Sequence, residues 1–273
     1  MKEFNGKLVL VTGAGSGIGR ETAVAFAKAG ARLVLTDIND DGTAQTEALI
    51  EQHGGIASRY VVNVTDAVAM KKLAERVQRE LGVVDVLVNN AGIGSAGRFL
   101  DTTLETWRKV IDVNLMGVVH GCHAFLPAMV ERGEGGHVVN LSSMAGYFAA
   151  PDMPVYAASK FAVLGFSESL RGDMAEHGIG VTAICPGVIN TGIIAATIME
   201  GDMGKESVRG KVQALYEKRN FTPAQVAAAI LDAVRRNQAV RPVSPESWAM
   251  YYAKRLAPGL VARAARMENP FTK

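Results

Sequence analysis

The sequence predicts an α/β fold in which one doubly wound parallel sheet carries helices on both faces. Short runs rich in leucine and β-branched residues alternate with longer helix-like segments, as in successive βαβ units. No repeat of about 20 to 50 residues is visible and no Pro/Gly-rich linker divides the chain, so we expect one domain. Right-handed crossovers between parallel strands then wind the sheet in both directions, which is the Rossmann-type arrangement.

Six segments are expected to be strands, because each is a short Leu/Val-rich or β-branched run. They are 8–11, 32–36, 57–62, 84–89, 136–141 and 180–185. Helices, several of which begin with a capping Asp or Thr, are expected at 18–29, 41–53, 67–81, 103–131, 155–177 and 223–237. The segment 113–130 is free of charge, but it contains Asn114 and Pro127, so we interpret it as a core helix rather than a membrane span.

The composition excludes several classes of protein. Of the 273 residues, 48% are apolar and 21% are charged, which is ordinary for a globular chain. The net charge of +2 gives no electrostatic reason to expect nucleic acid as a partner. The only cysteines, Cys122 and Cys185, have no metal-ligand spacing and are expected to be reduced, buried thiols, so we expect no metal site. The apolar run at 8–11 leaves no room for a signal peptide before it, so a cytoplasmic protein is expected.

A glycine-rich turn follows the first expected strand. Its sequence is Thr12-Gly13-Ala14-Gly15-Ser16-Gly17-Ile18-Gly19. The glycines allow a tight turn and a close approach of a diphosphate to N–H groups at a helix N-terminus. Ile18 breaks the GxGxxG pattern, and the turn alone is weak evidence. Its position between the first strand and the first helix favours a dinucleotide site.

Asp37 ends the second expected strand, eighteen residues after Gly19. A carboxylate there can accept hydrogen bonds from both hydroxyls of an adenosine ribose. A 2′-phosphate would meet like charge, and no Arg or Lys stands in the turn before Ile18 to compensate, so NAD(H) is favoured over NADP(H). Asp37 could instead cap the helix that begins near Asp41, and the two roles are compatible.

Further motifs follow in an order that one known family shares. After the glycine turn come Asn89-Asn90-Ala91-Gly92, Asn114, Ser143, Tyr156-x-x-x-Lys160 and Pro186-Gly187-x-x-x-Thr191. Over about residues 5–192 the sequence closely resembles the classical short-chain dehydrogenase/reductase family. The joint occurrence of these motifs is far more specific than any one of them. The resemblance implies hydride transfer between a nicotinamide cofactor and a secondary alcohol or ketone.

The resemblance implies four catalytic residues. They are Asn114, Ser143, Tyr156 and Lys160. Tyr156 and Lys160, four residues apart, share one face of a helix; Tyr156 is expected to exchange a proton with the substrate oxygen, and Ser143 to hydrogen-bond that oxygen. The phenol pKa must fall by about 3 units for this work, which the Lys160 ammonium and the nicotinamide charge could supply. Asn114 is expected to distort its helix and hold a water that links the lysine to solvent. Ser142 is expected to serve the strand end and the backbone, and an exchange of roles between Ser142 and Ser143 stays open.

The resemblance also implies a set of cofactor contacts. They are Gly13, Ser16, Gly17, Ile18, Gly19, Asp37, Ile38, Asn63, Val64, Asn90, Ala91, Gly92, Tyr156, Lys160, Pro186, Gly187, Val188 and Thr191. Asn63-Val64 stands where the family usually has Asp-Val beside the adenine, and an amide can still pair with the adenine amino group through its carbonyl. The Val188 backbone and Thr191 are expected against the nicotinamide carboxamide.

The substrate is expected to be a hydrophobic, lipid- or steroid-like alcohol or ketone. By the resemblance, the side chains around the substrate oxygen are Phe148, Ala149, Ala150, Met153, Val188, Ile193, Ile194, Ile198 and Met199. The same residues could instead simply pack a mobile lid. We expect a catalytic domain at 1–245, with the lid at about 192–222, and a basic-aromatic extension at 246–273. That extension is similar to the tails of membrane-associated family members, which favours peripheral membrane contact, and a subunit-interface role is equally open.

Other functions and an assembly follow from the same resemblance. An NADPH-dependent ketone or acyl-carrier-protein reductase is one alternative, which Asp37 disfavours. A non-catalytic nucleotide-sensing member is another, although it would more naturally have lost one of the four catalytic residues. The helices at 103–131 and 155–177 are expected to pair between subunits, so a homotetramer is predicted, with a dimer as the alternative. His120 and His123 are expected to serve packing or that interface.

Overall fold

The computed structural model describes residues 1–190, 192, 196–219 and 221–264. Its main strands are β1 (Leu8–Thr12), β2 (Arg32–Asp37), β3 (Ile56–Val61), β4 (Val86–Asn89), β6 (Gly136–Leu141), β7 (Ile179–Pro186) and β9 (Val240–Val243). In the described part of the chain they form one sheet in the order β3-β2-β1-β4-β6-β7-β9, and every pair is parallel. The chain reverses its winding direction between β1 and β4, so the predicted doubly wound sheet is confirmed.

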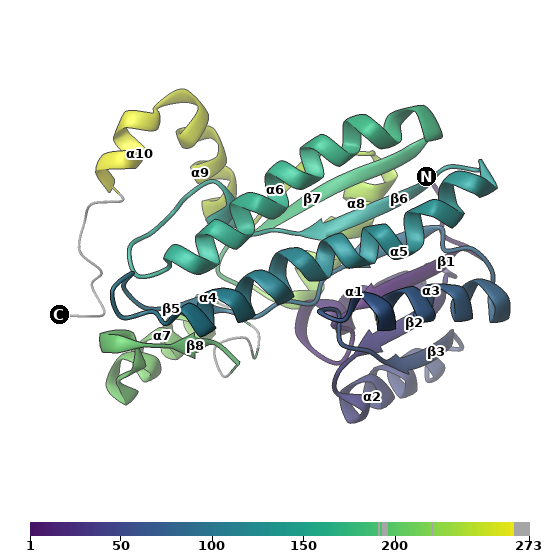
Figure 1. The fold of residues 1–273 in the computed structure, drawn as a ribbon, viewed down its shortest axis with the longest axis horizontal. Coiled ribbons are helices and arrows are strands. Elements are labelled where there is room, and N and C mark those ends of the chain that lie inside the picture. Colours follow the sequence, from purple (N-terminus) through teal and green to yellow (C-terminus); the bar gives the residue numbers. More distant parts are fainter. Residues whose placement is uncertain (191, 193–195, 220, 265–273) are drawn as a thin grey trace.

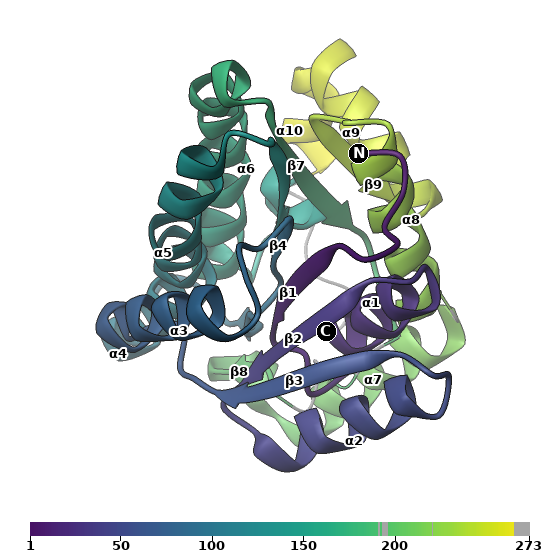
Figure 2. The ribbon, with the colours of Figure 1, turned by 90° about the vertical axis from the view of Figure 1, so that its right-hand side faces the viewer.

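Helices cover both faces of this sheet (Figure 1). They are α1 (Gly17–Lys28), α2 (Asp40–Glu51), α3 (Ala67–Glu80), α4 (Leu104–Ile111), α5 (Gly117–Arg132), α6 (Pro154–Met174), α7 (Glu206–Arg219), α8 (Pro223–Arg235), α9 (Pro245–Leu256) and α10 (Pro258–Ala264). Figure 2 shows α3, α5 and α6 on one face and α1, α2 and α8 on the other. Along β1, Val9 and Val11 enter the core on the α1 side, whereas Leu8 and Leu10 enter the core on the α3 side. This alternation follows from the two-residue period of a strand.

A seventh strand joins the six that the sequence predicts. β9 pairs with β7 at the edge of the sheet, and its residues Arg241 and Pro242 interrupt the apolar run that would have marked it as a strand. Proline is tolerated on an edge strand because the N–H that it lacks can be one that would face solvent rather than a neighbouring strand. A second, small sheet pairs β5 (Ser95–Ala96) with β8 (Ile198–Met199), which joins the loop after β4 to the lid region.

The long helix expected at 103–131 contains a local distortion. α4 continues through a π-helical segment, Asp112–Met116, into α5, and fully buried Asn114 lies in this segment. The distortion expected at Asn114 is therefore present. By length and composition alone the helix Leu104–Arg132 could cross a membrane. Its residues Phe125 and Met129 are instead buried in the core beside the sheet, as expected of a core helix.

The chain after β9 forms α9, which packs against β9 at the edge of the sheet, and α10, which packs against α9 (Figure 1). Ser247 in the first turn of α9 is fully buried. Trp248, Tyr251 and Tyr252 form a cluster with ring centroids 5.5 to 6.0 Å apart. The predicted domain boundary at 245/246 thus falls inside the first turn of α9, just before buried Ser247, and residues 265–273 of the predicted extension lie outside the described residues.

A buried histidine on β6 makes the stability of the fold dependent on pH. The Nε2 atom of His137 lies 2.8 Å from Oγ1 of Thr182, and that hydroxyl donates to the carbonyl of Gln238 at 2.6 Å. His137 must therefore donate to Thr182. Burial lowers the pKa of His137 from 6.5 to about 3, and the positive charges of the N-terminus and Arg171 act in the same direction.

We expect the free energy of unfolding to fall as the pH drops below the ordinary histidine pKa. The unfolded chain takes up a proton at His137 near pH 6.5, whereas the folded chain takes it up only near pH 3. Stability should therefore decrease by about 1.4 kcal/mol per pH unit across this window. Urea unfolding between pH 7 and about 4.5 measures it. In the His137→Gln variant the unfolding free energy should depend less steeply on pH, by the slope that one proton contributes. An equal slope in both proteins would contradict this assignment.

Candidate active site

The glycine turn lies between β1 and α1, where the order of the strands reverses. Gly13 and Gly17 have φ angles of 66° and 52°, a region that strongly favours glycine. A Cβ atom at Gly13 would lie 2.9 Å from the Cα atom of Ala91, and one at Gly19 would overlap the carbonyl oxygen of Gly13. The turn can therefore pass this close to the segment after β4 only because these positions lack side chains.

Hydrogen bonds fasten the turn to the segment after β4. The side-chain amide of Asn90 donates to the carbonyls of Thr12 at 2.9 Å and Gly13 at 3.1 Å. In return, Oγ1 of Thr12 accepts from the backbone N–H groups of Asn90 at 3.0 Å and Ala91 at 3.1 Å. Sequence reasoning did not identify Thr12 as a site residue, although Thr12 is the first residue of the glycine-turn motif.

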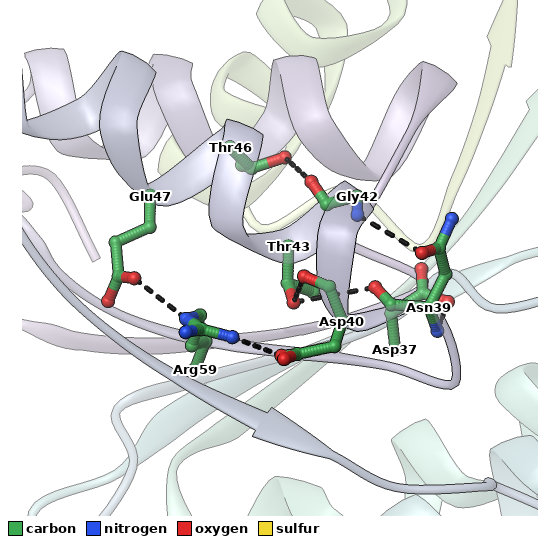
Figure 3. Close-up of polar contacts among 8 residues, drawn as sticks. All are labelled: Asp37, Asn39, Asp40, Gly42, Thr43, Thr46, Glu47 and Arg59. Atoms are coloured by element: carbon green, nitrogen blue, oxygen red, sulfur yellow. Dashed lines mark hydrogen bonds and ion pairs between the residues drawn. The ribbon is translucent and has the colours of Figure 1, made fainter.

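The Asp37 carboxylate lies against the same turn. One oxygen accepts from the N–H of Gly15 at 2.9 Å, and the other accepts from the N–H of Asn39 at 3.0 Å. The cap of α2 is Asn39, whose side chain accepts from the N–H of Gly42 at 3.2 Å (Figure 3). Asp37 therefore does not serve as the cap of this helix, and its remaining lone pairs are free to accept from ribose hydroxyls.

The N-terminus of α1 fits the diphosphate of a dinucleotide. Ser16 is the N-cap residue, is exposed, and makes no capping hydrogen bond, so its hydroxyl is available beside the N–H groups of the first turn. Such an end attracts anions. The guanidinium of Arg20 donates to the Gly15 carbonyl and, at 3.1 Å, to Thr46 on α2, which braces the turn.

The residues expected near the adenine differ in their exposure and in their hydrogen bonds. Ile38 is 71% exposed after β2. The side-chain oxygen of Asn63 accepts from the N–H of Thr65 at 3.1 Å, so this oxygen already closes a local turn. Val64 is buried, and its carbonyl lies 2.9 Å from Nδ1 of His120, which connects α5 to the segment after β3.

Tyr156 and Lys160 lie in the first turns of α6, and Ser143 lies in the loop after β6. Burial raises the pKa of Tyr156 to about 12, although a hydrogen bond with Ser143 opposes the rise. Lys160 points its ammonium at the carbonyl of Leu141, 2.9 Å away, and lies 5.7 Å from the centre of the Tyr156 ring. Burial therefore outweighs the hydrogen bond with Ser143, and the pKa of the phenol lies above its ordinary value rather than near neutrality.

Burial also acts on Lys160, and it lowers the pKa of the amine to about 8. At neutral pH the group is mostly charged but can lose its proton easily. The side chain of Ser142 donates to the carbonyl of Lys160 at 2.8 Å, so Ser142 supports the backbone as predicted.

Asn114 joins α6 to the loop after β4. Its oxygen accepts from the N–H of Ile93 at 2.8 Å, and its amide donates to the Ile93 carbonyl at 3.0 Å and to Oγ of Ser159 at 3.1 Å. A Cβ atom on Gly92 would lie 3.2 Å from the Asn114 oxygen and 3.5 Å from the Lys160 nitrogen. The two expected catalytic groups therefore border one space. Ser159 was missed, although a small polar residue beside Lys160 is a signal that could have indicated it.

The loop after β7 meets the C-terminal helix. The backbone N–H of Val188, expected to face the nicotinamide carboxamide, donates to Oε1 of Glu246 at 3.1 Å. Glu246 also forms an ion pair with Arg219 at the end of α7. Nothing in the sequence pattern indicated Glu246. Thr191, predicted beside Val188, lies outside the described residues, as do Ile193 and Ile194.

Two of the residues expected around the substrate contribute to packing. Phe148 packs on the buried cluster that contains Tyr147 and Cys185. Met199, in β8, packs on a separate cluster with Met203 of the lid region. Both interpretations of these apolar residues, a substrate pocket and a packed lid, are compatible with these contacts.

Comparison with known proteins places the chain among oxidoreductases. A family model described as short chain dehydrogenase matches residues 7–200. "Probable oxidoreductase EphD" of Mycobacterium tuberculosis is 48% identical over 268 residues, which are 97% of this chain and 45% of that protein. "Estradiol 17-beta-dehydrogenase 11" of Homo sapiens is 38% identical over 234 residues, 83% of this chain and 78% of that protein. The chain thus spans less than half the length of its EphD relatives.

Solved structures agree with this comparison. A short chain dehydrogenase/reductase from Burkholderia phymatum in complex with NAD has a TM-score of 0.87 and 29% identity, and the match covers 99% of both chains. A structure from Beutenbergia cavernae with bound NADP at low occupancy has a TM-score of 0.79 and 30% identity, covering 90% of this chain and 98% of the other. Structural neighbours of this chain therefore include proteins with each of the two dinucleotides.

The glycine turn generates a direct test. Replacement of Gly19 by Ala puts a methyl group into the Gly13 carbonyl, so we expect NADH binding to weaken about tenfold or more. A titration followed by nicotinamide fluorescence measures it. Gly172→Ala is the matched control, because a Cβ atom at this helical position of α6 meets nothing within 4 Å. Equal NADH affinity in the two variants would contradict the assignment of the turn.

Proposed function

The chain belongs to the short-chain dehydrogenase/reductase family of oxidoreductases, and from this premise we propose that it is an NAD(H)-dependent enzyme that interconverts a hydrophobic secondary alcohol and its ketone. The observation that carries the proposal is that Asn114 and Lys160 border the space beside Gly92, while the Tyr156 ring centre lies 5.7 Å from the Lys160 nitrogen and its phenol is hydrogen-bonded with Ser143. All four expected catalytic residues are present, which disfavours a non-catalytic nucleotide-sensing role.

The proposed reaction uses these side chains for proton transfer. A bound nicotinamide dinucleotide supplies the hydride acceptor or donor. Ser143 hydrogen-bonds the substrate oxygen, and Tyr156 gives a proton to that oxygen or takes one from it. Because burial raises the pKa of Tyr156 to about 12 in spite of the hydrogen bond with Ser143, phenolate formation needs positive charge from Lys160 and from the cofactor site. With a pKa of about 8, Lys160 can pass a proton onward near neutral pH.

NAD(H) is the proposed cofactor because of the charges around the adenosine ribose. Asp37 places a carboxylate at the glycine turn. Two guanidinium groups near this turn already have partners: Arg20 donates to the Gly15 carbonyl, and Arg59 pairs with Asp40 and Glu47 (Figure 3). These partners compete with a 2′-phosphate for both groups. The structural neighbour with NADP keeps an NADPH-dependent ketone or acyl-carrier-protein reductase as the alternative function.

The substrate class follows from the apolar surroundings of the site and from one relative. Phe148 and Met199, two of the residues expected around the substrate, are partly buried and pack on two separate apolar clusters. The name of the human relative, estradiol 17-beta-dehydrogenase 11, indicates a steroid alcohol for that protein. We therefore propose a lipid- or steroid-like alcohol or ketone for this chain.

We propose a cytoplasmic homotetramer, with peripheral membrane contact through the C-terminal segment. Exposed Phe161 on α6, together with Leu104 on α4, is apolar surface on the helices expected to pair between subunits. On α9 and α10, Leu256 and Leu260 are 82% and 65% exposed and lie among basic residues, which supports contact with an anionic surface.

The proton-transfer role of Tyr156 can be tested by removal of its hydroxyl. We expect Tyr156→Phe to lower kcat by about 10² to 10⁴-fold, because general acid–base catalysis is lost, while NADH affinity changes little. Steady-state oxidation of hydrophobic secondary alcohols measures kcat. Tyr60→Phe, which alters a phenol on β3, is the control and should retain full activity. Substantial turnover by Tyr156→Phe would refute the mechanism.

Cofactor preference depends on the charge of Asp37. We expect Asp37→Asn to reduce the NADH-over-NADPH affinity ratio about tenfold, because the amide keeps hydrogen-bonding capacity but no longer repels a 2′-phosphate. Asp41→Asn, which removes an exposed carboxylate from the first turn of α2, is the matched control and should leave the ratio unchanged. If NADPH binds better than NADH to the unaltered protein, the NADPH-dependent reductase is favoured over the NAD(H)-dependent enzyme.

A further inference from the structure

We propose that Glu246, in the first turn of α9, is a positioning residue that holds the loop after β7 and ties it to the lid helix α7. The proposal deepens the proposed function, on which it rests, because residues 186–188 of this loop are the ones expected beside the nicotinamide. It assigns part of the cofactor site to the C-terminal segment of the chain.

Two partners from distant parts of the chain meet at the Glu246 carboxylate. Oε1 accepts from the backbone N–H of Val188 at 3.1 Å, and Oε2 forms an ion pair with the guanidinium of Arg219. Val188 follows β7, whereas Arg219 is the last residue of α7. Hydrogen bonds with an ionised partner are stronger than those between neutral groups. One side chain thus joins the loop, the lid helix and α9.

A backbone contact reinforces this junction. The N–H of Asn190, two residues after Val188, donates to the carbonyl of Phe221 at 2.9 Å. The chain just after the loop therefore lies against the chain just after α7. Glu246 acts where these two segments are already adjacent, so its carboxylate can fix their relative position.

Gly187 must be glycine for the carboxylate to reach Val188. A Cβ atom on Gly187 would overlap Oε1 of Glu246 and would lie 2.5 Å from Oγ of Ser244. The N–H of Gly187 donates to the carbonyl of Val243 at 3.1 Å, which holds the glycine against the end of β9. The contact with α9 therefore explains, independently of the cofactor, why position 187 must lack a side chain.

The next residue anchors α9 to the other side of the site. Ser247 is fully buried, and its hydroxyl donates to the carbonyl of Cys185 at 2.6 Å. The hydroxyl of Tyr147, four residues after Ser143, donates to the carbonyl of Ser247 at 2.9 Å. The first turn of α9 therefore contacts both the end of β7 and the loop that carries Ser143, and it holds Glu246 on a fixed backbone.

The ionisation of Glu246 agrees with this role. Burial raises the pKa of its carboxyl, but hydrogen bonds, including that from Val188, and the charge of Arg219 lower it further, so the pKa is below its ordinary value. Glu246 is therefore ionised at neutral pH, which is the form that the Arg219 pair requires.

Amide hydrogen exchange, followed by mass spectrometry on the full chain, tests the proposal with no need for turnover. The proteins compared are the wild type, Glu246→Ala, Glu246→Gln and Arg219→Gln. Glu80→Gln is the matched control, because Glu80 pairs with Arg76 on the exposed face of α3, away from this junction. Titration of each protein with NADH gives a second, independent readout.

We expect a different pattern from each variant. Glu246→Ala loses both contacts, so exchange should rise about tenfold at Val188 and in α7, and NADH should bind about tenfold more weakly. Glu246→Gln keeps an acceptor for the Val188 N–H but loses the charge, so only α7 should exchange faster. Arg219→Gln should behave like Glu246→Gln, and the control like the wild type.

Unchanged exchange at Val188 in Glu246→Ala would overturn the proposal. So would an equal rise in β1 and β4, since that indicates a general loss of stability rather than a local release. If Glu246→Ala does not fold, protection of Val188 and release of α7 in Glu246→Gln decide the question. Failure of the wild type to bind NADH would refute the proposed cofactor, while the exchange data would still test the role of Glu246.

Discussion

The hydrogen bonds between the turn after β1 and the segment after β4 are the contacts on which the rest of the site depends. Thr12 and Asn90 bond in both directions across the point where the winding of the sheet reverses. Gly13 and Gly19 lack side chains, so the turn can approach closely enough for these bonds to form. The Thr12 hydroxyl is buried and the Asn90 amide half-buried, and such groups stabilise a fold only when they are hydrogen-bonded; here each bonds the backbone of the other segment. These bonds therefore hold the N-terminus of α1 beside Asn90, and the Asp37 carboxylate lies against the same glycine turn.

A second set of polar contacts fixes α6 on the same edge. The Lys160 ammonium reaches Leu141, Ser142 reaches the Lys160 carbonyl, and Asn114 reaches Ser159. Burial of an amine is unfavourable to its charged form, and this cost appears as the fall of the Lys160 pKa to about 8. The same burial that orients the lysine therefore makes it suitable for the proposed proton transfer.

The two ends of α9 have different surroundings. Its first turn, with Glu246 and Ser247, is part of the junction around the loop after β7. Its later residues, such as Leu256, are exposed and remain available for the proposed membrane or subunit contact. Composition alone marks the whole segment as basic and aromatic, and it does not separate the buried turn from the exposed end.

The sequence by itself determined the alternation of strands and helices, the glycine turn and the spacing of Tyr156 and Lys160, because periodicity and close backbone approach are local properties. It left β9 unrecognised, since Arg241 and Pro242 hide a strand that exists through its pairing with β7. Only the tertiary structure decided the partners of Thr12, Ser159 and Glu246, which lie 78, 45 and 58 positions away in the chain. Such contacts depend on strand order and on helix packing, which no local pattern specifies.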